Sequence, residues 1–184
     1  MKKVLSSRFF ERNTLVVARD LLGKFLCRKV GGRAVAFMIT ETEGYHGFKD
    51  LASKARRGKT PGNAPMYARA GTVYVYFTYG MHWMLNIVTE KEEYPAAVLI
   101  RGAGGVVGPA RLTKFLKIDK RLNTKMLSKK SGLWIEDRRV RVRPAEITKG
   151  PRVGIDYAGP YKLKPWRFIY TAAMPARQRA SHRR

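Results

Sequence analysis

Acidic residues, cysteine and long apolar runs are all scarce in this chain. Its 184 residues hold 13 Asp and Glu against 38 Lys and Arg, for a formal net charge of +25. The single cysteine, Cys27, excludes an internal disulfide and fits a reducing compartment. No run of about 18 apolar residues occurs, so no membrane-spanning helix is expected. The N-terminal segment lacks the apolar stretch of a secretory signal, and we expect a cytoplasmic protein, nucleoid-associated if its source is prokaryotic.

Histidine is scarce as well, which bears on metal chemistry. The three histidines are scattered and no group of Cys and His has the spacing of a zinc site, so neither a metal nor another cofactor is expected. The excess of positive charge calls for a polyanionic partner, because a chain with this net charge repels itself. Nucleic acid is the expected partner, and an anionic membrane surface is the alternative.

The remaining composition is that of a folded protein. Hydrophobic residues make up 45% of the chain, which is long enough for one domain with a core. Apolar periodicity, turn residues and capping residues predict a series of helices and strands. The expected order is a helix within 9–26 that Asn13 or Thr14 caps and Gly23 ends, strands at 24–30 and 33–45, a long basic loop at 46–65, a hairpin at 71–90, a central strand at 94–102, a helix at 108–118, a second hairpin at 132–144, and closing strands at 151–159 and 164–170.

Tyrosines cluster in the first predicted hairpin, in the stretch YVYFTYG. Tyr74 and Tyr76 share one face of a strand, and Tyr79 falls at the turn. Strand tyrosines are often ordinary core residues, and that interpretation stays open for the first two. An aromatic side chain at a hairpin tip is exposed, and in a basic protein it can stack on a nucleic-acid base, which is worth about 1–3 kcal/mol.

Two acids interrupt the basic sequence in the stretch ITETEGYHG. In a strand, Glu41, Glu43 and Tyr45 project from the same face. Carboxylates in such an arrangement suit chemistry at a glycosidic bond, although each acid could simply pair with a basic neighbour. Arg101 follows the apolar segment AVLI, so its charge needs a partner. It is expected to lie near Glu43 and hold that carboxylate ionised, or to form a structural salt bridge only.

An ordered series of motifs spans the chain from about residue 9 to residue 168. The motifs are ETEGYHG, RRGKTPGN, GTVYVYFTYGMHWMLN, AVLIRG, GPARLTK, PRVGI and KPWRF. No one of them is decisive, but the series at consistent spacing resembles the alkyladenine (3-methyladenine) DNA glycosylase family. The resemblance implies a monofunctional DNA glycosylase of base excision repair that acts as a monomer on damaged bases in double-stranded DNA. The implied substrates are alkylated purines such as 3-methyladenine and 7-methylguanine, with hypoxanthine and ethenoadenine as further candidates.

The resemblance also implies how the bond is cleaved. Glu43 matches the family's general base, which activates a water that attacks the sugar C1′ of a flipped-out nucleotide. Arg101 and the backbone carbonyl of Val153 match the groups that help to hold this water. The reaction then releases the base and leaves an abasic site.

Four further residues match the family's base pocket and its wedge, and a fifth position differs. Tyr45 and Tyr76 are implied to stack on the flipped base, Tyr79 to intercalate into the duplex, and Asn86 to disfavour guanine by crowding its amino group. Lys54 departs from the pattern, since family members typically carry a histidine there. Three consequences stay open: Lys54 loses its proton on burial, reaches a phosphate, or changes the substrate range.

The expected architecture is a single α+β domain. Its sheet is curved and mostly antiparallel, with flanking helices and a protruding β-hairpin. Residues 1–170 form the catalytic domain and residues 171–184 a basic, disordered tail. The alternative function is a non-catalytic protein that binds lesions or nucleic acid in general, which the charge and the tyrosines fit equally well. That alternative offers no reason for Glu43 to stand beside Tyr45.

Overall fold

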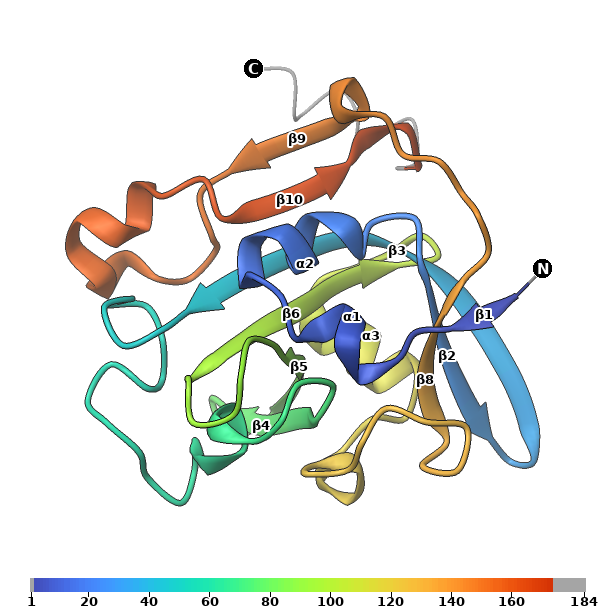
Figure 1. Ribbon diagram of the computed structural model, residues 1–184, viewed down its shortest axis with the longest axis horizontal. Helices are drawn as coiled ribbons and strands as arrows, with labels where there is room; N and C mark the ends of the chain where they lie inside the picture. The colour runs from blue at the N-terminus through green and yellow to red at the C-terminus, as the bar shows by residue number, and fades with distance from the viewer. Residues whose placement is uncertain (1, 174–184) are drawn as a thin grey trace.

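The computed structural model describes residues 2–173 (Figure 1). Its α-helices are α1 (Ser7–Phe10), α2 (Thr14–Asp20) and α3 (Pro109–Phe115). Its strands are β1 (Lys3–Val4), β2 (Phe25–Val30), β3 (Arg33–His46), β4 (Val73–Thr78), β5 (His82–Val88), β6 (Ala96–Ala103), β7 (Val106–Val107), β8 (Leu133–Asp137), β9 (Ile147–Gly150) and β10 (Arg167–Tyr170). Short 3-10 helices are η1 (Ala64–Tyr67), η2 (Lys120–Leu122), η3 (Pro144–Glu146), η4 (Asp156–Leu163) and η5 (Thr171–Ala173). Helix η5 takes up the first three residues of the predicted tail, and the rest of that prediction lies outside the described residues.

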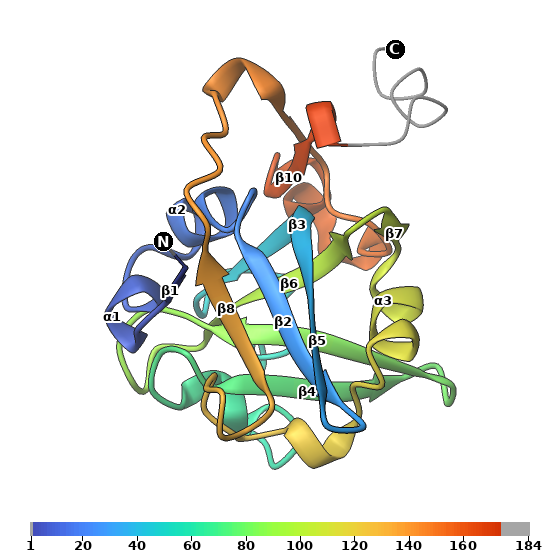
Figure 2. The same ribbon diagram turned by 90° about the vertical axis from the view of Figure 1, so that its right-hand side faces the viewer.

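One sheet of ten antiparallel strands dominates the structure. Its main path runs β1-β8-β2-β3-β6-β5-β4, while β10 bridges β3 and β9, and β7 pairs with β6. The sheet bends strongly, so that β2 and β8 cross in front of β5 and β6 in Figure 2. Helices α1 and α2 lie on one side of this bend and α3 on the other. The predicted α+β class and the central position of β6 are therefore confirmed.

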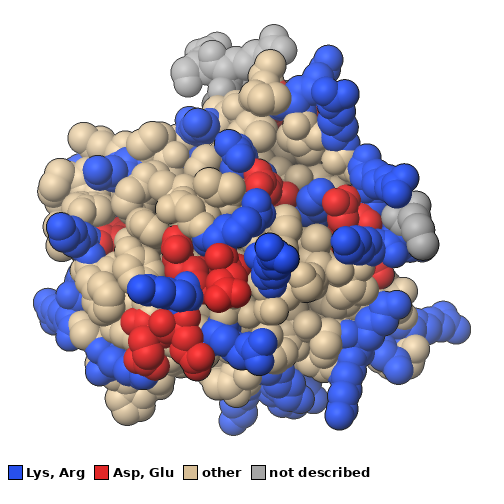
Figure 3. Space-filling model, viewed as in Figure 1, with Lys and Arg blue, Asp and Glu red and all other residues tan. Residues whose placement is uncertain are grey.

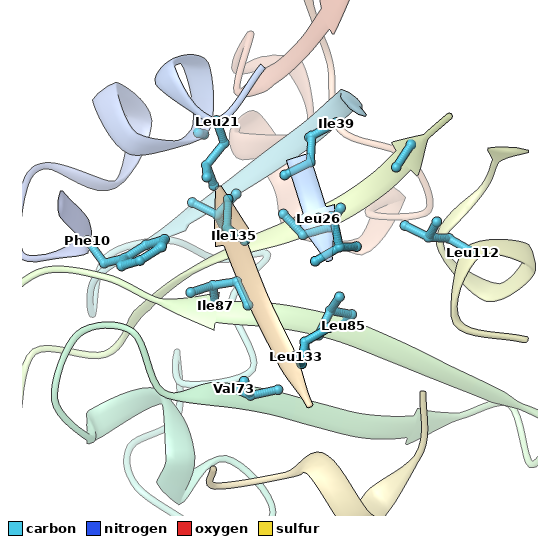
Figure 4. Packing of buried hydrophobic residues seen from close by; sticks show 14 of the residues in the cluster. Phe10, Leu21, Leu26, Ile39, Val73, Leu85, Ile87, Leu112, Leu133 and Ile135 are labelled. Carbon is cyan, nitrogen blue, oxygen red and sulfur yellow. The ribbon is translucent and has the colours of Figure 1, made fainter. Parts of the chain in front are cut away.

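The main core lies inside the bend of the sheet. Figure 4 shows side chains of β8 and β2 meeting those of β5 and β4 across it. The cluster also takes Phe10 from α1, Leu112 from α3 and Leu21 from the end of α2. Since the core occupies one face of β3 to β6, the alternate residues of these strands face the other way. That opposite face carries the candidate site.

The β4–β5 hairpin forms as predicted. Thr78 pairs with His82, and Tyr79 and Gly80 between them both have positive φ, 52° and 64°. Glycine adopts this conformation readily, whereas a tyrosine does so only where the turn requires it. Tyr79 is 78% exposed, which confirms the expected exposure of an aromatic side chain at the tip.

The first predicted helix is confirmed as α2, since the Asn13 side chain caps it by accepting bonds from the N–H groups of Leu15 and Val16. The short helix α1 before it was not predicted. Two other sequence-based assignments need correction. Residues 138–143 are not a strand: Arg139 has a φ of 62°, and Val140 and Val142 pack against Gly23. Residues 151–155 are a loop and residues 156–159 begin η4, and the strand that pairs with β10 is β9 instead.

Candidate functional site

A row of directly paired residues crosses four strands on the face opposite the core. Glu43 pairs with Leu99, Leu99 with Asn86, and Asn86 with Tyr74. Directly opposed residues in antiparallel strands point to the same side of the sheet. The predicted alternation of β3 therefore holds, and it aims Glu43 away from the core.

Arg101 lies on this face because it is two residues after Leu99 in β6. It also lies at a β-bulge, since Thr42 pairs with Ile100 and Glu41 with Gly102, which leaves Arg101 as an extra residue in β6. The Arg101 Nε donates to Glu41 Oε1 at 2.8 Å and lies 3.4 Å from Glu43 Oε1. Arg101 thus lies beside Glu43 as expected, but its closer partner is Glu41.

Glu41 serves as a charge partner. Its Oε1 accepts from Arg101 and lies 2.9 Å from the Nε of Arg167 on β10. The side chain is almost fully buried, and a buried carboxylate needs such partners. The simpler of the two sequence interpretations, pairing with a basic neighbour, therefore holds for this acid.

Glu43 is fully buried and accepts two hydrogen bonds. The backbone N–H of Val153 donates to its Oε1 at 2.8 Å, and the Tyr45 hydroxyl donates to its Oε2 at 3.0 Å. Burial raises the pKa of Glu43, and the positive charge of Arg101 together with these two hydrogen bonds only partly opposes that rise. From the sequence we expected Arg101 to hold Glu43 ionised. Its charge opposes the rise in the pKa of Glu43 but does not cancel the effect of burial. The group of Val153 that contacts the carboxylate is its backbone N–H.

A cavity of about 440 Å³ opens beside these residues. Its size falls within the range typical of small-molecule sites. Its wall is formed by Tyr45, Ala52, Lys54, Met66, Tyr74, Tyr76, Thr78, Tyr79, Met84, Asn86, Leu99, Arg101, Pro109, Ala110, Val153, Gly154, Ile155 and Tyr157. All the predicted pocket residues are among them, and the Tyr45 hydroxyl links the cavity wall to Glu43.

The cavity side chains differ in burial and in their hydrogen bonds. Tyr74 is buried and donates to the carbonyl of Gly62 at 3.1 Å, so the core interpretation is right for this tyrosine. Tyr76 is half-buried and its ring lies 5.3 Å from that of Tyr74. The Asn86 amide donates to the carbonyls of Tyr74 and Met84, both at 3.3 Å, which fixes its orientation. Tyr76 and Asn86 therefore present defined surfaces to the cavity.

Lys54 lies in the cavity wall. Its Nζ sits 4.4 Å from the centroid of the Tyr76 ring, a cation–π arrangement. Burial lowers the pKa of Lys54, and the nearby Arg56 lowers it further. Of the three consequences left open by the sequence, this placement is relevant to the substrate range, because Lys54 lines the cavity.

A buried ion pair that no sequence motif indicated lies next to the site, between Asp50 and Arg152. The guanidinium of Arg152 donates to both carboxylate oxygens of Asp50, at 2.6 and 2.8 Å, and to the carbonyl of Gly44 at 2.8 Å. It also lies between two rings, 4.7 Å from the centroid of Tyr45 and 4.8 Å from that of Trp166. Arg152 therefore braces Tyr45 and precedes Val153, whose N–H binds Glu43. Asp50 and Arg152 are 102 residues apart, too far for any local pattern.

Within residues 2–173, no group of three or more His, Cys, Asp or Glu is placed to hold a metal ion. The same range contains no helix with the length and apolarity to cross a membrane. Lys and Arg spread over the face shown in Figure 3, where acidic side chains gather near the centre.

Both comparisons with known proteins found DNA glycosylases. The family model described as methylpurine-DNA glycosylase (MPG) matches residues 8–107 and 104–174. Relatives described as "Putative 3-methyladenine DNA glycosylase" include one from Methanocella arvoryzae, 41% identical, with 90% of this chain and 91% of the relative aligned. Another, from Sodalis glossinidius, is 43% identical over 90% of this chain and 95% of the relative. A third, from Desulfitobacterium hafniense, is 38% identical over 90% of this chain and 94% of the relative.

Proposed function

Since this chain belongs to the methylpurine-DNA glycosylase family, we propose that it is a DNA glycosylase that hydrolyses the N-glycosidic bond of damaged purines in double-stranded DNA. The observation that carries the proposal is the buried carboxylate of Glu43, linked by Tyr45 to a cavity with aromatic walls. A purine is flat and apolar on its faces, so aromatic walls suit it, and a carboxylate beside it can accept a proton from water.

The chemistry follows from these groups. The duplex hides the glycosidic bond, so the nucleotide must first be flipped out at a cost of a few kcal/mol. Tyr79 at the hairpin tip fills the gap that is left. Glu43 takes a proton from a water whose oxygen forms a bond to C1′, and Arg101 and Val153 help to position that water. The bond from C1′ to the base breaks with its electron pair going to the base, and an abasic site remains.

The pocket defines the substrates we propose. Tyr45 and Tyr76 stack on the flat faces of the flipped base, and alkylated purines such as 3-methyladenine and 7-methylguanine are candidate substrates. Asn86, held rigidly by two carbonyls, crowds the amino group of normal guanine. Hypoxanthine and ethenoadenine are further candidates. The formal charge of +25 binds phosphates without reading sequence, in keeping with a cytoplasmic monomer that searches duplex DNA.

The proposal is tested by incubating the protein with two labelled duplexes, one methylated and one containing hypoxanthine. We expect free base in solution and an abasic strand that stays uncut until alkali is added, because the reaction uses water and no enzyme amine. Strand cleavage without alkali contradicts the monofunctional mechanism. Tight lesion binding with no released base favours the non-catalytic alternative.

Tyr79→Ser tests the intercalating role. Loss of one stacked ring should slow base release from duplex DNA by about 5- to 150-fold, the equivalent of 1–3 kcal/mol. Binding to undamaged duplex should stay unchanged, since phosphate contacts dominate it. Tyr79→Phe is the control and should keep most activity. The loss should shrink when the damaged base lies in single-stranded DNA, where no stack has to be opened, and an equal loss there contradicts the role.

A further inference from the structure

Lys54 places a positive charge against the ring on which the flipped base is proposed to stack. Its Nζ lies 4.4 Å from the centroid of Tyr76, and both residues line the cavity. The carbonyl of Lys54 accepts from the Asn63 side chain at 3.0 Å, which anchors the loop that carries it. The ammonium therefore occupies the aromatic surface from a fixed backbone position.

The charge of Lys54 is not neutralised locally. The cavity wall has two cationic side chains, and Arg101 is paired with Glu41 and Glu43. No Asp or Glu within the described residues forms an ion pair with Lys54, and its charged neighbour is Arg56. Burial also lowers the pKa of Lys54, as expected for an ammonium that has lost water without gaining a carboxylate.

Such a charge interacts differently with cationic and with neutral damaged purines. A purine alkylated on a ring nitrogen is cationic, so it meets like-charge repulsion and competes with the ammonium for the same electron-rich ring face. A neutral purine such as hypoxanthine brings the acceptors N7 and O6, to which an ammonium can donate. Charge-assisted hydrogen bonds of this kind are stronger than neutral ones.

We propose that Lys54 determines the substrate class of this pocket, favouring neutral purines with ring-edge acceptors over cationic alkylated purines. The inference rests on the proposed function of the site. It makes Lys54 a specificity residue, acting through its position over Tyr76 and not through a phosphate outside the cavity.

The test measures binding in the Glu43→Gln background, where the base stays attached, so its outcome does not depend on hydrolysis. The probes are duplexes with hypoxanthine or with 7-methylguanine in a 2′-fluoro nucleotide, which resists spontaneous base loss, in mildly acidic buffer that keeps the methylated base cationic. Adding Lys54→Met should shift the ratio of the two dissociation constants by about ten-fold toward 7-methylguanine. Adding Lys54→Arg, which keeps the charge, should leave binding to the hypoxanthine duplex tighter than binding to the 7-methylguanine duplex.

Arg57→Met is the matched control, because it removes one positive charge from the same loop and Arg57 does not line the cavity. It should weaken binding to both duplexes equally and leave the ratio of the two dissociation constants unchanged. An unchanged ratio in Lys54→Met, or an equal shift in Arg57→Met, overturns the inference. Failure of the proposed function shows separately, as absence of base release by the wild-type protein.

Discussion

Glu43→Gln is expected to slow base release by about 10²- to 10⁴-fold, the usual contribution of a general base. The substitution is close to isosteric. The amide oxygen can still accept from the Val153 N–H, and the Tyr45 hydroxyl can rotate to accept from the new NH₂ group. The substitution removes the negative charge and, with it, the ability to take a proton from water. The measurement is single-turnover release of base from the methylated and hypoxanthine duplexes.

The same variant should be more stable than the wild type at neutral pH. Burial raises the folded-state pKa of Glu43 above the usual value for glutamate, 4.5. The folded state therefore holds the proton more tightly than the unfolded state, and stability falls as the pH rises from the unfolded value to the raised folded value. Glutamine carries no such charge, so the melting temperature should rise while activity falls. Lower activity with a lower melting temperature indicates structural damage instead.

Glu41→Gln is the matched control for this prediction. Glu41 lies on the same strand and face and is also buried, but its carboxylate is bound by Arg101 and Arg167. We expect a smaller loss of base release, caused by poorer placement of Arg101, and no gain in stability. Equal losses in the two variants would contradict the assignment of the general base to Glu43.

Asp50→Ala is expected to cost about 3–5 kcal/mol in the free energy of unfolding, because it leaves the buried guanidinium of Arg152 without a counter-charge. Asp50 also accepts from the N–H groups of His46 and Ala52, so the start of the loop loses its anchor. Urea denaturation at neutral pH measures the loss. The surface pair of Asp20 with Arg12 and Arg19 provides the control, and Asp20→Ala should cost about 1 kcal/mol or less.

The buried pair should also act on the chemistry. Arg152 backs the ring of Tyr45 and precedes Val153, so its displacement loosens both hydrogen bonds to Glu43. In protein that remains folded, at low temperature, Asp50→Ala should therefore release base more slowly, whereas Asp20→Ala should match the wild type. Destabilisation with full activity would show that the pair supports the fold and not the site.

Several parts of the site follow from local rules alone. The period of two in a strand brings Glu43 and Tyr45 to one face, and the apolar run before Arg101 makes β6 central. The short turn between β4 and β5 exposes Tyr79. These rules fail where tertiary packing competes: the Val–Arg alternation in 138–143 has strand periodicity, but its valines pack on Gly23 instead of joining the sheet.

The sequence by itself determined the fold class, the excess of charge that requires a polyanion, and the residue types that could perform glycosidic chemistry, since these depend on composition and on backbone periodicity. Tertiary structure alone decided how those residues behave. The ion pair of Arg101 with Glu41, the N–H that Val153 brings from 110 residues away, and the ammonium of Lys54 over Tyr76 all arise from segments that only folding brings together. The raised pKa of Glu43 has the same origin, because desolvation depends on what covers a carboxylate and not on its neighbours in the chain.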